Sequence, residues 1–214
     1  MILEYNQLMD KVLQFFAGEQ FQDEIRIAKR DFFDSSSIFD EGSSHFELRM
    51  AQFFDWYFFS RKLRGYECTP LEGALLPREL KYTTGEIDMI NIMRRHRNCL
   101  FEYIKTKNSN LILRDLVSDK KITVKESPFV SGFAEDEIFQ VRVIPIGDSY
   151  IFTRGFCFHP PEAKKYIYQE AKRHRKNPDL SVEQLLLKLT KMRYKYEQYK
   201  HVTINKIYCN EPSA

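Results

Sequence analysis

The stretch INIMRRHRNCLFEY, residues 90–103, is where the chain changes from a helical pattern to a strand-like one. Before it, Thr83 and Glu86 have the spacing of a capping box, which predicts that a helix starts there. After it come short segments rich in β-branched and aromatic residues, which are typical of strands. Three arginines and a histidine therefore stand at the junction between a helix and a strand.

The chain before this junction has a helical pattern. Apolar residues recur at helical spacing in the segments 3–16, 23–34, 46–63 and 84–97, with a polar loop expected at 34–44. The sequence TPLE, residues 69–72, has a second capping-box spacing and predicts another helix start. Asp55 lies in a stretch that is apolar almost all round, so we expect its carboxylate to accept hydrogen bonds from backbone or from an arginine. A catalytic acid is the alternative interpretation of Asp55.

The chain after the junction has a strand pattern. Short apolar segments at 99–107, 111–117, 122–126, 138–146 and 149–159 are separated by turn sequences, the longest at 127–137. Gly147 and Asp148 fit a two-residue hairpin turn. Because Arg142 alternates with valines, we expect one face of its strand to be in contact with solvent. The pattern predicts a small antiparallel barrel or a strongly curled sheet.

The C-terminal part returns to helix. Pro160 and Pro161 end the sheet, and helical segments follow at 162–176 and 182–200. The last helix has apolar residues at helical spacing, which we expect in the core: Leu185, Leu186, Leu189, Met192, Tyr196 and Tyr199. The fold class is thus α+β, with a helical domain at 1–97, a β-module at 98–159, basic C-terminal helices at 160–205 and a tail at 206–214.

Composition limits the class of protein. Hydrophobic residues make up 43% of the 214 residues, which suits a globular chain, and no apolar run approaches the roughly 20 residues of a membrane span. The first residues, MILEYNQLMD, show no secretory signal pattern. The four cysteines are widely spaced and form no CxxC pair, so a zinc ribbon is not expected. These features favour a cytoplasmic protein with reduced thiols.

Charge is unevenly distributed along the chain. Residues 1–60 carry 11 acidic and 5 basic side chains, whereas residues 160–214 carry 12 basic and 6 acidic ones. Such a split indicates either a partner for the basic end or a meeting of the two ends, in the fold or in a homodimer.

Three stretches resemble an uncharacterised group of bacterial proteins. Residues 53–72 show F-D-W followed by T-P-L, residues 111–127 show D-L and V-x-E-S, and residues 135–155 show R-V-x-P. The resemblance covers about residues 46–158. It implies a helical part followed by a small β-module in a bacterial cytosolic protein, and it implies no activity.

A second resemblance is to the PilZ domain, a small β-barrel that binds cyclic di-GMP. That family carries R-x-x-x-R before its first strand and D-x-S-x-x-G on the barrel. Arg94, Arg95 and Arg97 occupy the first place, but no two are four residues apart. Arg114 and Asp115 mark the second place, where the expected Ser and Gly are replaced. The resemblance implies a cyclic-dinucleotide site at these five residues.

The arginine cluster also has a structural interpretation. Arginines donate paired hydrogen bonds to phosphate, so Arg94, Arg95 and Arg97 could clamp a phosphodiester. Cations at the C-terminus of a helix also complement its dipole and bind its free carbonyls, and we favour this interpretation.

The C-terminal helices offer a second basic surface. Lysines and arginines there alternate with tyrosines, a composition that suits nucleic acid. The candidate residues are Lys172, Arg173, Arg175, Lys176, Lys191, Arg193 and Lys195. They could equally be the solvated face of helices whose other face is core.

Enzyme motifs are missing from the sequence. There is no G-x-S-x-G, Walker loop, H-E-x-x-H or dinucleotide fingerprint, and His159 is expected to be structural. We therefore expect no catalytic residue, no metal and no cofactor. The leading hypothesis is a non-enzymatic interaction or regulatory module, with nucleic-acid binding and cyclic-dinucleotide binding as alternatives.

Overall fold

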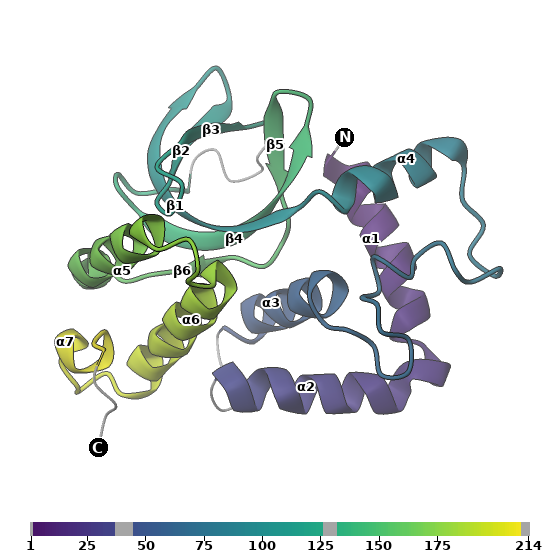
Figure 1. Cartoon of the computed structure of the whole chain (residues 1–214), viewed down its shortest axis with the longest axis horizontal. Helices are drawn as coiled ribbons and strands as arrows, with labels where there is room; N and C mark the ends of the chain where they lie inside the picture. Colours follow the sequence, from purple (N-terminus) through teal and green to yellow (C-terminus); the bar gives the residue numbers. More distant parts are fainter. Residues whose placement is uncertain (1, 37–44, 126–131, 211–214) are drawn as a thin grey trace.

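The computed structural model describes residues 2–36, 45–125 and 132–210. Its chain is α+β, as the sequence predicts: N-terminal helices are followed by a β-barrel and then by C-terminal helices (Figure 1). The predicted loop at 34–44 and the predicted long turn at 127–137 lie partly outside the described residues. Within the described ranges, no helix is both long enough and apolar enough to cross a membrane.

The N-terminal part is built from helices. They are α1 (Ile2–Phe16), the 3-10 turn η1 (Glu19–Phe21), α2 (Gln22–Ser36), α3 (Phe46–Phe59) and α4 (Thr84–Met93). The capping box predicted for α4 is confirmed. The Thr83 hydroxyl accepts a hydrogen bond from the Glu86 amide at 3.2 Å, and the Glu86 carboxylate accepts one from the Thr83 amide at 2.7 Å.

The second predicted helix start is only partly confirmed. Thr69 and Glu72 make both reciprocal hydrogen bonds, at 2.8 and 3.1 Å. Turns follow instead of a helix. Gly73 is a poor helix former and Pro77 blocks helical continuation, so the capping bonds close a turn here.

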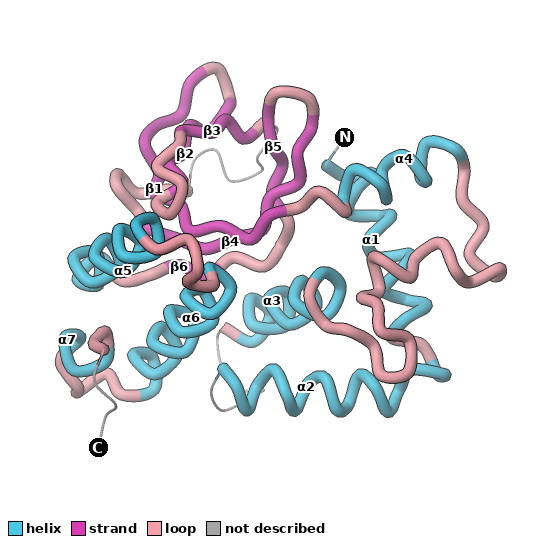
Figure 2. The backbone as a smooth tube through the Cα atoms, in the orientation of Figure 1, coloured by secondary structure: helices cyan, strands magenta, loops and turns pink. Residues whose placement is uncertain are grey.

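The β-part closes into a barrel (Figure 2). Its strands are β1 (Arg97–Lys107), β2 (Asn110–Asp115), β3 (Lys121–Val124), β4 (Ile138–Ile146), β5 (Ser149–Phe152) and β6 (Cys157–Phe158). Strand β1 pairs with β2 and β4, β2 with β3, and β4 with β5, all antiparallel. The short β6 adds to β4.

The barrel is mixed and not purely antiparallel as expected. Val124 of β3 pairs with Tyr150 of β5 in parallel. Closure brings together two strands that run in the same direction, and strand periodicity carries no information about which edges meet. The segment 149–159, expected as one strand, divides into β5 and β6 because a bend at Arg154 separates them.

The strand face that carries Arg142 is not in contact with solvent. Val141 and Val143 point into the barrel core, so Arg142 points outward, but it is only 4% exposed. The expectation of a solvated face was wrong there because helices cover this side of β4 and a carboxylate pairs with the arginine.

The C-terminal part packs against the barrel. It comprises η2 (Pro161–Ala163), α5 (Lys164–Lys176), α6 (Val182–Gln198) and α7 (Ile204–Ile207). Tyr208 is buried, so the start of the expected tail belongs to the core. In α6 Tyr194 is buried, and Tyr199, directly after the helix, is exposed, contrary to the predicted core face. The reason is that Tyr194 packs toward α3, where its hydroxyl donates to Gln52.

Three clusters of buried apolar side chains join these parts. The N-terminal helices share a cluster with Ile144 and Ile151, on the outside of β4 and β5. A second cluster fills the barrel. The C-terminal helices share a third with Leu100 and Ile138 of β1 and β4. The barrel is therefore covered on two sides, and α3 and α6 approach each other beside β4 (Figure 1).

Candidate functional site

A polar cleft lies where the N-terminal helices, the barrel and α6 meet. We call it the junction cleft. Its outer part has a volume of about 390 Å³ and its inner chamber about 60 Å³. The two parts are adjoining, because five residues line both: Ser60, Asn98, Arg142, Glu183 and Leu186.

A buried ion pair stands at the inner end of the junction cleft. Arg142 on β4 donates from Nε to Oδ1 of Asp55 on α3 at 3.1 Å. Their side chains are 5% and 10% exposed. The prediction that Asp55 accepts a hydrogen bond from an arginine is confirmed. Ion pairs this well buried need further hydrogen bonds to offset the loss of hydration.

Arg142 obtains part of that compensation from two more side chains. Its Nη2 donates to the hydroxyl of Ser60 at 2.9 Å, and its Nη1 lies 2.9 Å from Nδ1 of His96. The guanidinium also lies 4.8 Å from the ring centre of Phe59, a cation–π distance. One guanidinium thereby holds together strand β4, the C-terminal part of α3 and the segment between α4 and β1.

His96 is neutral in this setting. A guanidinium can only donate hydrogen bonds, so Nδ1 of His96 accepts and the proton is on Nε2. Burial, together with the charge of Arg142, lowers the pKa of His96 to about 3. The ring therefore offers an N–H donor at neutral pH, and it lines the outer part of the junction cleft.

Asp55 has an unsatisfied oxygen. Its Oδ2 is buried and has no hydrogen-bond partner among the described residues. Gly155 packs directly on the Cβ side of Asp55: a Cβ at Gly155 would lie 2.8 Å from the Cβ of Asp55. A glycine at 155 is thus required for Asp55 to sit where Arg142 can reach it.

The three arginines next to His96 diverge. Arg94 donates to the Glu72 carbonyl at 2.9 Å and to Asn91 at 3.2 Å. Arg97 lies over the Tyr150 ring at 5.1 Å, and Arg95 is exposed. Arg94 and Arg97 therefore bind different elements, and His96 is the member of the cluster that enters the cleft. Phosphate binding by the arginines stays a prediction.

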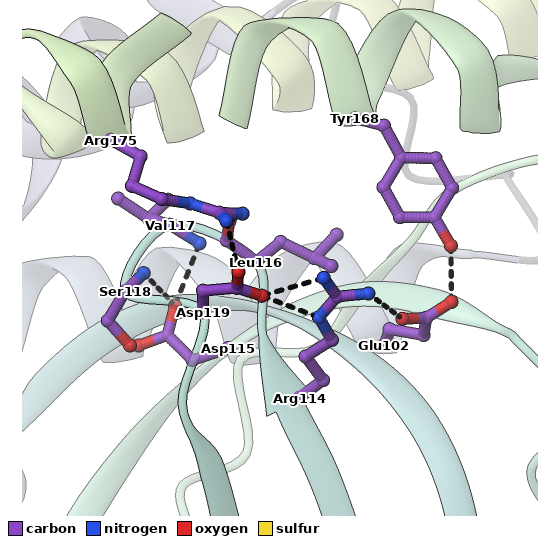
Figure 3. A network of polar contacts seen from close by, with 9 residues as sticks. All are labelled: Glu102, Arg114, Asp115, Leu116, Val117, Ser118, Asp119, Tyr168 and Arg175. Atoms are coloured by element: carbon purple, nitrogen blue, oxygen red, sulfur yellow. Dashed lines mark hydrogen bonds and ion pairs between the residues drawn. The ribbon is translucent and has the colours of Figure 1, made fainter. Parts of the chain in front are cut away.

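Arg114 and Asp115 take part in a network around the turn between β2 and β3 (Figure 3). Arg114 donates from Nε to Asp119 at 2.7 Å, and its Nη1 lies 3.6 Å from Glu102. Oδ1 of Asp115 accepts from two backbone amides of the turn, at 3.0 and 3.2 Å. These contacts shape the turn. The cyclic-dinucleotide site predicted from these residues and the three arginines stays a prediction. Loss of cyclic-dinucleotide binding in Arg94→Ala plus Arg97→Ala would support it.

Arg175 extends this network to α5. It binds Asp119, and it donates to the Leu116 carbonyl at 2.9 Å (Figure 3). The C-terminal end of α5 therefore lies against the β2–β3 turn. Lys120 of that turn and Lys121 at the start of β3 follow Asp119 in the chain, and both are exposed.

The other basic candidates divide into two groups. Arg193 donates to the Phe158 carbonyl at 2.6 Å and pairs with Glu197 at 2.7 Å, so it fastens α6 to β6. Lys195 is half-buried. The remaining candidates are exposed: Lys172, Arg173, Lys176 and Lys191.

His159 has the structural role that the sequence predicts. Its Nε2 lies 2.8 Å from Gln140, and its Nδ1 lies 3.1 Å from the Tyr208 hydroxyl. Burial lowers the pKa of His159 to about 3. The chain from Gln140 through His159 to Tyr208 ties the barrel to the C-terminal end of the structure.

Another cavity lies between α1 and α3. It is about 590 Å³ in volume and is lined mainly by apolar side chains such as Leu13 and Phe54, although Asp55 lines it as well as the inner chamber. We place the candidate site in the junction cleft instead, because buried charged groups with spare hydrogen-bonding capacity converge there and give a site its specificity. Within the described residues, no group of three or more His, Cys, Asp or Glu side chains could hold a metal ion.

The sequence singled out Asp55 but not its partners. Arg142 was placed on a solvated strand face, and His96 was treated as one member of a basic cluster. A signal was present: the single charged residue in the strand 138–146, an arginine, requires a buried counter-charge if both strand faces are covered. The covering helices could not be deduced from the strand pattern.

Comparisons with known proteins place the chain in an uncharacterised family. A search of the curated proteins and a search of the solved structures each found no match. A scan against protein-family models matches residues 5–203, which include the whole stretch 46–158 that carries the resemblance, to a family described as a family of unknown function (DUF7986). The chain belongs to this family of unknown function.

Proposed function

We propose that the protein is a non-enzymatic binding module that takes up a small polar molecule in the junction cleft. The observation that carries the proposal is the buried pair of Asp55 and Arg142, which both line the inner chamber, while Oδ2 of Asp55 has no hydrogen-bond partner among the described residues. Buried polar groups are normally satisfied, and an exception needs an explanation such as a ligand or an ordered water. Perturbed titratable groups in a cleft also mark functional sites.

The chemistry of the junction cleft favours binding over catalysis. A general base works best when its pKa is near the operating pH, whereas the pKa of His96 is lowered to about 3. The hydroxyl of Ser60 accepts from Arg142, and Nδ1 of His96 does the same, so neither activates the other. This arrangement suits a rigid receptor with fixed donors and acceptors.

A thermal-shift screen tests the proposal. The screen uses small neutral, cationic and anionic compounds at millimolar concentration. A ligand at 100 times its Kd stabilises the folded state by about 2.7 kcal/mol, which shifts the melting temperature measurably. We expect stabilisation of the wild type and of the control Lys172→Gln, and its loss in Asn98→Leu. Equal stabilisation of the wild type and Asn98→Leu would exclude the junction cleft as the binding site.

Nucleic-acid binding is a second candidate function. It is favoured by the contact of Arg175 with Asp119, because Asp119 is followed in the chain by two exposed lysines, Lys120 and Lys121. Fluorescence anisotropy with single-stranded RNA and DNA is the test. We expect affinity to fall steeply as salt rises, and to fall further in Lys172→Gln plus Lys176→Gln but not in Lys81→Gln. Binding that ignores salt would contradict this candidate.

A further inference from the structure

We infer that the outer face of β1, β2 and β3 is a binding surface for the phosphate backbone of a nucleic-acid duplex. The lysines of this face do not line the junction cleft, so the inference is independent of ligand binding there. It extends the second candidate function from α5 to the barrel, and it therefore rests on nucleic-acid binding. Three properties of the face carry the inference: the direction of its side chains, its charge and the groups that it lacks.

The strand register places four lysines on this face. Apolar side chains of β2 and β3 fill the barrel, and side chains alternate between the two faces of a strand. Lys105 of β1 lies opposite Ile112 of β2, which stands between two leucines of the barrel core, so both point outward. Lys107 follows two residues later on the same face. Lys121 and Lys125 flank three residues of β3, the outer two of which belong to the core, so these lysines also point outward.

The helices cover other parts of the sheet. The N-terminal helices pack on β4 and β5, and the C-terminal helices pack on β1 and β4. Neither of these two apolar clusters includes a described residue of β2 or β3, which lie on the side of the barrel away from α2 and α3 (Figure 1). Lys105, Lys107, Lys121 and Lys125 are all exposed, and we call them the barrel lysines.

The charge of the face is positive. Lys120 in the turn before β3 and Arg114 on β2 add to the barrel lysines. The acidic neighbours of Arg114 are already paired. Glu102 is buried and lies 3.6 Å from Arg114, and Asp119 binds both Arg114 and Arg175. A concentration of lysines with few free carboxylates suits a polyanion.

An acidic segment limits the face on one side. The Tyr103 amide of β1 donates to the Glu137 carbonyl at 2.9 Å, so the acidic residues 135–137 border β1 on the side away from β2. The positive surface therefore runs from the end of β1 across β2 to β3, and not toward β4.

The groups that the face lacks narrow the partner. The exposed large apolar side chains of the described residues lie on other elements: Leu3, Tyr66, Leu75, Leu76, Ile87 and Tyr199. Single strands are held by bases that stack on aromatic rings, and membrane surfaces take up apolar side chains. Lysine instead contacts phosphate as a point charge and reads no base. A duplex presents the denser array of phosphates, so the face fits a duplex without sequence preference.

Fluorescence anisotropy with two labelled DNA duplexes of equal length and unrelated sequence tests the inference. We expect both duplexes to bind with affinities equal within about twofold, and more tightly than either separated strand. Each lysine that contacts a duplex phosphate contributes about 0.9 to the slope of log K against log salt concentration. In Lys121→Gln plus Lys125→Gln, we therefore expect that slope to fall by about 1–2 and the affinity at low salt to fall at least about tenfold.

Two control variants separate contact from net charge. Lys81→Gln plus Lys206→Gln removes two exposed lysines from other elements and should leave the affinity and the slope unchanged. Lys121→Arg plus Lys125→Arg keeps both charges on the face and should restore binding. Circular dichroism checks that all the variants are folded.

The outcomes distinguish the inference from the second candidate function. Equal duplex binding by the wild type and Lys121→Gln plus Lys125→Gln overturns the inference, and the candidate stands if Lys172→Gln plus Lys176→Gln still weakens single-strand binding. Tighter binding of a single strand, or a strong preference for one duplex, also overturns the inference. So does sedimentation with vesicles of phosphatidylcholine and about a quarter phosphatidylserine without duplex binding. If no nucleic acid binds, the inference and the second candidate fail together.

Discussion

The contact between Asp55 and Arg142 gives the sharpest stability prediction. Replacing one partner of a buried ion pair leaves the other charge buried and uncompensated, which typically costs about 3–5 kcal/mol. With side chains 10% and 5% exposed, this pair belongs to that class. We therefore expect Asp55→Ala and Arg142→Met each to lower the free energy of unfolding by about 3–5 kcal/mol.

The double variant makes the prediction specific. Removing both charges leaves neither one unpaired, so Asp55→Ala plus Arg142→Met should cost less than the sum of the single changes by at least about 2 kcal/mol. Urea unfolding measures these free energies. Fluorescence of Trp56, the only tryptophan, and far-ultraviolet circular dichroism should give coincident transitions if unfolding is two-state.

Two results would refute this reasoning. Single variants within about 0.5 kcal/mol of the wild type would mean that the pair is solvated, as surface pairs are. If the stability losses of the two single variants add up to that of the double variant within about 0.5 kcal/mol, the two side chains act independently. The exposed pair of Arg26 and Asp23, at 3.0 Å, is the matched control, and its removal should change stability by less than about 1 kcal/mol.

Three further predictions concern single residues. Burial lowers the pKa of His159 to about 3, so as pH falls the unfolded state binds a proton at this histidine before the folded state does. The free energy of unfolding should therefore decrease below about pH 6.5, by about 2 kcal/mol at pH 5. Urea titrations at pH 7 and pH 5 measure the difference, and His159→Gln should remove the part that this histidine contributes. Gly155→Ala places a Cβ 2.8 Å from the Cβ of Asp55 and should cost about 1–3 kcal/mol, whereas Gly85→Ala, with open space around it, should stabilise by about 0.4–1 kcal/mol in the same assay. Thr83→Ala removes the cap of α4 and should lower the melting temperature, with a cost of about 1 kcal/mol.

The sequence predicted local structure better than the contacts between its parts. The spacing of Thr83 and Glu86 was enough to place the start of α4, because a capping box is made within one turn of chain. The parallel pairing of Val124 with Tyr150 was missed, because which strand edges meet depends on barrel closure. The same spacing at Thr69 and Glu72 formed its bonds without a helix, since the residues that follow disfavour one.

The candidate site illustrates the same limit. Asp55 could be singled out, because a carboxylate inside an apolar helix demands a partner. Its partner Arg142 is 87 residues away along the chain, and no local pattern connects them. His96 was read together with its neighbouring arginines because they are adjacent in sequence, yet the end of α4 turns its ring toward the junction cleft and leaves Arg95 in solvent.

The account rests on the claim that the junction cleft is a ligand site organised by Asp55 and Arg142. The most direct test is to map, by ¹H–¹⁵N NMR, where the compound with the largest thermal shift binds. We predict that the perturbed signals gather at Asn98, at the Arg142 side chain and at the start of α6, and that they vanish in Asn98→Leu. Perturbations confined to the cavity between α1 and α3, or to the basic end of α5, would contradict the claim.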